Sequence, residues 1–346
     1  MFWSLGLVRV GWSWMSHAKR RSIFLGAVAA LLLLVSTWFW FNRQYVQDLL
    51  IVRQFVPSSE IASISDRVKF TDHGQFLFYA SEPEINDAES FNIHCSRREP
   101  VAAVLGCYRD QNIYIYKVDN SELDGIREVT AVHEMLHAAW DRLSVSERNR
   151  LTPLLEESYQ KHKTDELEER MKYYDRQQPG ERVNELHSIL ATETADLGQE
   201  LEDYYQQYFV DRQNIVSLHD SYQSVFTELE QQAEKLQSEL EKMSSRLNQD
   251  IADHNDAIED LNSRIEAHNQ AFSSVDRTNP YEVEAYNFRR AEIQAEQERL
   301  RSNRHDLDDR RKEYNKKLEQ YNEIVVHTSE LTDSIDSLKA PTDFGL

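Results

Sequence analysis

A seven-residue apolar repeat near the end of the chain constrains its fold more than any other feature. In the last third, an apolar residue, or a threonine in one case, recurs at every seventh position: Tyr286, Ile293, Leu300, Leu307, Tyr314, Tyr321, Thr328 and Ile335. Before this run, apolar residues from Tyr222 to Phe272 alternate in three- and four-residue steps, with one slip near Leu247. Since such steps place apolar side chains on one helical face, both segments predict long coiled-coil helices.

A short polar break separates these two arms. Ser273-Ser274 and Asn279-Pro280 end one helix before the next begins. Each arm would have about 60 residues and a length of about 90 Å. We therefore expect residues 206–338 to form an antiparallel coiled-coil hairpin, with pairing between two chains as the alternative. Its charge runs predict solvated helix faces, and its function would be binding a protein partner or self-association. Residues 339–346 are expected to form a flexible tail.

An apolar segment near the N-terminus predicts a membrane anchor. Residues 23–41 contain no charge, and nineteen helical residues can cross about 28 Å of hydrocarbon. Three basic residues, 19–21, precede the segment, whereas basic residues are sparse after it. The positive-inside rule then predicts that residues 1–22 are a cytoplasmic tail and that the rest is extracytoplasmic. A cleaved signal peptide is the alternative, although no A-x-A site follows. Residues 42–65, ending beyond Pro57, would form a stalk.

The pentapeptide His133-Glu134-Met135-Leu136-His137 indicates a metal site. On a helix, two histidines four residues apart can bind one metal, and the glutamate beside them can take a proton from a metal-activated water. Residues 112–118 alternate β-branched and aromatic side chains and predict a strand. Ser121 is the expected N-cap of a helix of about twenty residues that carries both histidines. An ordinary amphipathic helix with two surface histidines is the competing interpretation.

A catalytic zinc site usually has three protein ligands, so a third is needed. The segment 182–196 predicts a helix, and Glu193 falls in the middle of a face formed by four leucine and isoleucine residues. A carboxylate in that position must be paired or bound to a metal. Glu193 is therefore the preferred third ligand, and Glu185, two turns earlier, is the alternative. Pairing of Glu193 with an arginine would be the structural explanation.

The strand, the HExxH helix and the later glutamate resemble the zincin metallopeptidases, and within them the gluzincin subgroup. The resemblance covers about residues 110–197 and implies a mainly α domain with a small β-sheet over residues 66–205, holding one Zn²⁺ per chain. It implies that Asp196 orients a ligand imidazole, although its offset of three residues from Glu193 departs from the usual four. It also implies an edge strand that aligns an extended peptide, formed by Ile113, Tyr114, Ile115 and Tyr116.

These features together predict a membrane-anchored zinc metallopeptidase that hydrolyses peptide bonds of a peptide or protein substrate. Glu134 would act as general base toward a zinc-activated water. Five residues are candidates for stabilising the oxyanion, and the sequence does not choose between them: Tyr173, Tyr174, His187, Tyr204 and Tyr205. The alternative is a non-catalytic scaffold that tethers the coiled coil to the membrane, but a scaffold has no use for Glu134 between the histidines.

Cysteine content and charge complete the prediction. Cys95 and Cys107 both fall on the predicted outer side, which favours a disulfide over two free thiols. A net charge of −21 and a pI near 5.0 oppose binding to nucleic acid. The 346 residues include only 9 Gly and 7 Pro, which indicates long uninterrupted helices and a mainly α fold.

Overall fold

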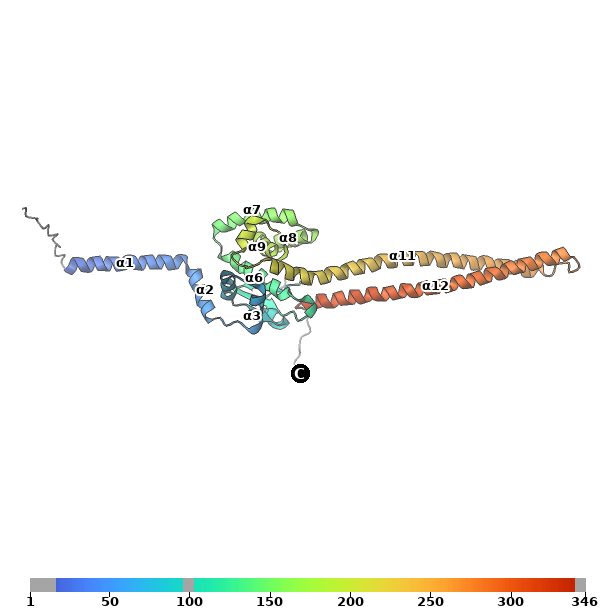
Figure 1. The fold of residues 1–346 in the computed structure, drawn as a ribbon, viewed down its shortest axis with the longest axis horizontal. Coiled ribbons are helices and arrows are strands. Elements are labelled where there is room, and N and C mark those ends of the chain that lie inside the picture. Colours follow the sequence, from blue (N-terminus) through green and yellow to red (C-terminus); the bar gives the residue numbers. More distant parts are fainter. Residues whose placement is uncertain (1–16, 96–102, 340–346) are drawn as a thin grey trace, which may run out of the picture. The chain divides into compact units, whose positions relative to one another are not determined.

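The computed structural model describes residues 17–95 and 103–339, and their side chains from residue 24 onward (Figure 1). Residues 1–16 of the predicted cytoplasmic tail and residues 340–346 of the predicted C-terminal tail lie outside these residues, whereas residues 17–22 form the start of a helix. The protein is mainly helical with one small sheet, as the sequence predicts. Its residues divide into two compact units: the first comprises residues up to 85, 108–114 and 131–212, and the second comprises residues 86–107, 115–130 and 213 onward. This division differs from the predicted boundary near residue 205, because the residues just before the HExxH motif group with the hairpin.

Helix α1 (His17–Phe41) contains the apolar segment. Its part Phe24–Phe41 has a mean hydropathy of 2.1, and none of it is buried in the protein. By length and composition, this one helix among the described residues is able to cross a membrane or to serve as a signal sequence.

The segment predicted as a stalk instead belongs to the first unit. It forms α2 (Arg43–Gln54) and most of α3 (Ser59–Val68), which is capped by Ser58. Asp48 of α2 is buried, and its two carboxylate oxygens accept hydrogen bonds of 2.9 Å from Arg142. A buried charge needs such a partner, and this distant pairing has no local sequence signal. Helix α4 (Asp72–Ala80) follows, capped by Thr71.

The sheet has three short strands in the order β1-β3-β2. They are β1 (Glu84–Asn86), β2 (Gly106–Arg109) and β3 (Asn112–Tyr116). A two-residue turn at Asp110-Gln111, with φ of 53° and 69°, joins β2 to β3. The predicted strand is therefore present, but it is central rather than an edge: both of its sides are paired. The proposal that Ile113 to Tyr116 align a peptide is wrong for this reason, and β2 is an edge strand.

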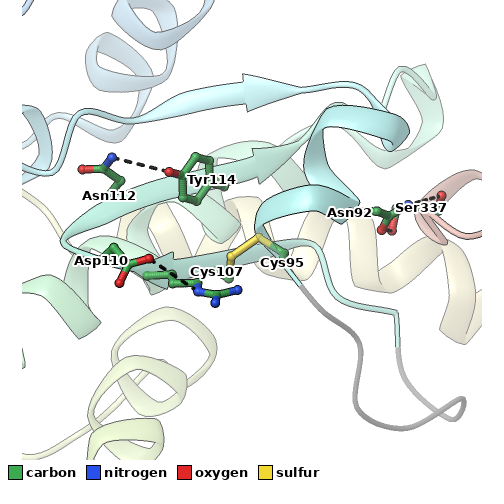
Figure 2. Close-up of a disulfide and its surroundings, with 8 residues drawn as sticks. Asn92, Cys95, Cys107, Asp110, Asn112, Tyr114 and Ser337 are labelled. Atoms are coloured by element: carbon green, nitrogen blue, oxygen red, sulfur yellow. Dashed lines mark hydrogen bonds and ion pairs between the residues drawn. A yellow bond between two sulfur atoms is a disulfide. The ribbon is translucent and has the colours of Figure 1, made fainter.

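Cys95 and Cys107 form the predicted disulfide, with their Cα atoms 5.8 Å apart (Figure 2). It joins the end of α5 (Ala88–His94) to β2 within the second unit. Figure 2 also shows Asn92 of α5 bonded to Ser337: the Asn92 amide donates to the Ser337 carbonyl, and the Ser337 hydroxyl donates to the Asn92 amide oxygen. The chain just beyond the hairpin is thereby fixed to α5.

The helix with the HExxH motif begins later than predicted. Asn120, rather than Ser121, is a cap, and it caps the short 3-10 helix η1 (Ser121–Leu123). Gly125 then adopts a φ of +99°, and a Cβ atom there would lie 3.0 Å from the Cβ of Leu218. Helix α6 (Ile126–Arg142) starts only after this glycine. Close approach of the chain at Gly125 thus sets the start of α6.

Four helices follow α6 in the first unit: α7 (Val145–His162), α8 (Asp165–Gln177), α9 (Arg182–Glu193) and α10 (Gln199–Tyr205). A capping box of Ser144 and Glu147 opens α7. Helix α9 packs against α7 and α8, and every residue from Glu185 to Thr192 is buried (Figure 1). A helix buried on all sides is expected to carry apolar residues, so the polar residues of α9 need a specific explanation.

The predicted coiled coil is present in the second unit as α11 (Gln213–Ala271) and α12 (Pro280–Ile335), which pack along each other (Figure 1). Ion pairs join residues early in α11 to residues late in α12, and residues later in α11 to earlier ones in α12, so the two helices are antiparallel. Lys317 pairs with Glu239, and Arg310 pairs with Asp250. Repeat positions supply the packing, as in the cluster of Leu261, Ile293 and Leu300.

Candidate metal centre

Helix α6 presents the two motif histidines to α9. Between and around them, Val132, Met135 and Leu136 are fully buried and fix the orientation of the helix. The His133 and His137 rings meet edge to face, with centroids 4.8 Å apart. The i, i+4 spacing places both imidazoles on one helical face, as the sequence predicts.

Glu185 of α9 completes a group of three candidate metal ligands. Its Oε2 atom lies 3.6 Å from His133 Nε2 and 3.8 Å from His137 Nε2. One ligand atom from each of the three residues falls within 4.8 Å of the other two. Glu185 is only 6% exposed, and its Oε2 has no hydrogen-bond partner in the protein. A buried carboxylate oxygen without a donor is costly, and a cation between these three atoms would satisfy it.

The structure does not include Glu193, the preferred ligand from the sequence, in this group, although its charge acts on His133. The two guanidinium nitrogens of Arg170 in α8 donate to its two oxygens, one of them over 3.1 Å. Glu193 is also the last residue of α9, two turns beyond Glu185. The assignment is therefore corrected: Glu185 is the acidic member of the cluster, and Glu193 forms the arginine pair that was the alternative explanation.

Asp196 is likewise not beside an imidazole. Since α9 ends at Glu193, Asp196 no longer follows its helical register. Its carboxylate accepts the Gly198 backbone N–H and pairs with Lys161 at 3.4 Å, in an exposed position. The orienting contact comes instead from Asn184, whose Oδ1 lies 2.9 Å from His137 Nδ1.

This contact fixes the tautomer of His137. The Asn184 Nδ2 donates to Glu181 Oε2, which leaves Oδ1 facing the imidazole as an acceptor. His137 Nδ1 therefore carries the proton, and in the neutral ring the Nε2 lone pair points toward Glu185. A second group that holds one ring nitrogen while the other faces the metal is the usual arrangement of histidine ligands.

The ionisable groups of His133 and Glu185 influence each other's pKa values. Burial opposes ionisation of Glu185, but the charge of His137 and the close approach of His133 outweigh it, so the pKa of Glu185 is lowered. Burial also opposes protonation of His133, yet the close approach of Glu185 and the charge of Glu134 outweigh it and raise the pKa of His133.

Glu134 lies between the two ligands in sequence and is 7% exposed. Burial raises its pKa, and the nearby charges of His137 and His133 only partly offset this. Hydrogen bonding by the backbone of Tyr108, in the edge strand β2, also acts on its carboxylate. Glu134 is thus a buried carboxylate with a raised pKa, beside an edge strand of the sheet.

The candidate oxyanion stabilisers are distributed over two places. The Tyr174 hydroxyl of α8 hydrogen-bonds Glu185, and burial raises the pKa of Tyr174. His187 instead bonds the Tyr204 hydroxyl at 2.9 Å, and the Tyr205 hydroxyl donates to the His187 carbonyl. These three residues form an aromatic cluster with Trp140. Tyr174 is therefore the one of these candidates for which the structure gives a direct contact with the metal-ligand group.

The donor set fits a metal ion. Two imidazoles and one carboxylate are the donors of several catalytic zinc sites, and all three converge here in a buried position. Sequence reasoning missed Asn184, which supports His137. A helical wheel centred on Glu185 rather than on Glu193 places Asn184 and Ser188 on the same face and would have indicated both.

No protein-family model, curated protein or solved structure matches this chain. A functional interpretation consequently depends on the chemistry of the site itself.

Proposed function

We propose that this protein is a zinc-dependent metallopeptidase that hydrolyses peptide bonds. The observation that carries the proposal is the buried group of His133, His137 and Glu185, with the Glu134 carboxylate next to both histidines in sequence. A purely structural ion site needs the three ligands but has no use for Glu134.

His133, His137 and Glu185 would hold the ion, and Asn184 would keep His137 Nε2 directed toward it. Zn²⁺ in such a site supplies Lewis-acid chemistry, which makes water a nucleophile near neutral pH and polarises a carbonyl. Imidazole and carboxylate donors in this number suit zinc, whereas magnesium and calcium prefer oxygen donors alone.

Glu134 would act as the general base. Proton transfer is most efficient when the pKa of the base lies near the working pH, and burial shifts the pKa of Glu134 upward in that direction. The same carboxyl group, once protonated, could return the proton to the leaving amine.

Strand β2 would align the substrate in place of β3. Strand β2 is at one side of the sheet order in the described part of the chain, so an extended peptide could pair along its outer side. The contact between the Tyr108 backbone and Glu134 supports this choice, since it puts the strand beside the proposed base. The Tyr174 hydroxyl would then hydrogen-bond the developing oxyanion near Glu185.

We also propose that α1 anchors the protein in a membrane, with residues 1–22 in the cytoplasm. The charge asymmetry around the apolar segment supports this orientation, and the Cys95–Cys107 disulfide fits an oxidising compartment on the other side. The hairpin would then reach a protein partner or a second copy outside the cytoplasm.

A cleavage assay tests the proposed activity. Full-length protein in detergent is incubated with a mixture of peptides covering all residue types, and products are identified by mass spectrometry. We expect cleavage that a chelator abolishes and that stoichiometric zinc restores. Zinc-free protein that neither binds the metal nor cleaves any peptide would support a scaffold that only presents the hairpin.

A further inference from the structure

A fourth side chain, Ser188 of α9, contacts both motif histidines. Its Oγ atom lies 3.3 Å from His133 Nε2 and 3.5 Å from His137 Nε2. Ser188 is completely buried, one turn beyond Glu185 on the same helical face. The hydroxyl therefore lies on the side of the imidazoles where a metal ion would bind.

The hydroxyl proton of Ser188 has partners away from the histidines. Ser188 Oγ donates toward the backbone carbonyls of Glu185 and Asn184, at 3.1 and 3.3 Å. Its lone pairs then face the two Nε2 atoms. His137 Nε2 also presents a lone pair, because its Nδ1 proton is held by Asn184. Two acceptors cannot hydrogen-bond each other, but both can coordinate one cation.

The spacing of these atoms leaves room for a metal ion between them. With metal–ligand bonds of about 2.0–2.1 Å, neighbouring corners of a tetrahedron are about 3.3 Å apart. Ser188 Oγ lies 3.3 and 3.5 Å from the two histidine nitrogens, and Glu185 Oε2 lies 3.6 and 3.8 Å from them. The four distances from the two histidine nitrogens to Ser188 Oγ and Glu185 Oε2 are thus equal to or somewhat longer than the edge of such a tetrahedron, and the His133, His137 and Glu185 ligand atoms lie within 4.8 Å of one another.

We propose that Ser188 Oγ is a fourth metal ligand in the substrate-free protein. It would occupy the coordination position that must be open for hydrolysis. This inference rests on the proposed function. A neutral hydroxyl is a weaker donor than an imidazole or a carboxylate, so substrate can displace it. Rotation about the single Cα–Cβ bond of Ser188 would move Oγ without moving α9. The site would be closed to water until substrate arrives.

Cobalt-loaded protein provides a test that does not depend on activity. Full-length protein is loaded with Co²⁺, and its visible and near-ultraviolet spectra are compared for wild type, Ser188→Cys and Ser188→Ala. A thiolate at position 188 would give Ser188→Cys a sulfur-to-cobalt charge-transfer band and raise metal affinity by about tenfold or more. In wild type, X-ray absorption should show four protein donors, and Ser188→Ala should gain an exchangeable water that is visible by ¹⁷O broadening.

Thr192→Cys is the matched control. Thr192 is also a buried hydroxyl on α9 and donates to the Ser188 carbonyl at 2.9 Å, outside the cluster. We expect no charge-transfer band from this variant. Two results would overturn the role of Ser188 alone, provided that wild type binds the metal through Glu185. One is the absence of a charge-transfer band in Ser188→Cys, and the other is an exchangeable water on the metal in wild type. Failure of wild type to bind the metal, or equal binding by Glu185→Gln, would overturn the proposed function as well.

Discussion

The α9 region and the α11–α12 hairpin differ in the burial and pairing of their charged side chains. In the hairpin, charged side chains form ion pairs in half-exposed positions, as in the Lys317–Glu239 contact of 2.7 Å, while repeat positions such as Leu300 fill the interface. In α9, Glu185 is buried beside the two motif histidines, and one of its oxygens has no hydrogen-bond partner.

This difference distinguishes side chains that stabilise the fold from side chains that lower its stability. The apolar repeat positions of the hairpin agree with the period that stabilises two packed helices. The buried acceptors of α9 oppose folding unless a cation binds between them. Residues that lower stability in this way are expected where chemistry is done.

The largest expected effect is on catalysis. Replacing Glu134 with Gln keeps the shape of the site but removes the general base, so kcat/KM for peptide cleavage should fall by about 10²–10⁴-fold. Zinc content, measured by elemental analysis, should stay at the wild-type value. Cleavage at the wild-type rate by this variant would exclude Glu134 as the base. It would also contradict the explanation that the buried charges near α9 are present for catalysis.

Ion pairs provide a second test of the comparison. Arg142→Met leaves the Asp48 carboxylate buried without its charged partner, with only the Gln44 amide still donating to it, and the free energy of unfolding should fall by about 3–5 kcal/mol. The hairpin variant Lys317→Met removes a half-exposed pair and should lower the unfolding free energy by a much smaller amount. Both are measured by chemical denaturation. Equal effects of the two variants would contradict the distinction between buried and exposed charge.

Acid should weaken the first unit through His187. Burial lowers the pKa of His187 to about 3, so between that value and the ordinary pKa near 6.5 the unfolded chain binds a proton that the folded chain does not. The unfolding free energy should therefore decrease as the pH falls from about 6.5 toward 3, by on the order of a few kcal/mol. The His187→Gln variant should show a smaller slope in denaturation at several pH values. An unchanged slope would mean that His187 is protonated when folded.

A smaller effect is expected from the group that supports His137. Asn184→Ala releases the imidazole Nδ1, and zinc affinity should decrease by about 10–100-fold in a chelator competition. Asn92→Ala is the control, because Asn92 also forms two hydrogen bonds but binds Ser337 at the hairpin base. Equal zinc affinity of wild type and Asn184→Ala would show that Asn184 does not act on the ligand.

The sequence predicted features that repeat or that depend on neighbours in the chain. The seven-residue period gave both hairpin helices, and the HExxH spacing gave the histidine pair. Partners from distant segments were not predictable in the same way. A helical wheel shows that Glu193 lies on an apolar face, but not that Arg170 covers it. The strand at residues 112–116 was recognised, yet its central position follows from β1 and β2 pairing on both sides. Asp48 similarly finds Arg142 only in the folded chain.

The most direct test of the account is zinc binding by full-length wild type, Glu185→Gln and Glu193→Gln, measured by elemental analysis and chelator competition. We predict one zinc per chain in wild type and in Glu193→Gln, and an affinity lowered by about 100-fold or more in Glu185→Gln, because a charged ligand is lost. Full zinc affinity in Glu185→Gln, or its loss in Glu193→Gln, would contradict the assignment of Glu185 as the third ligand.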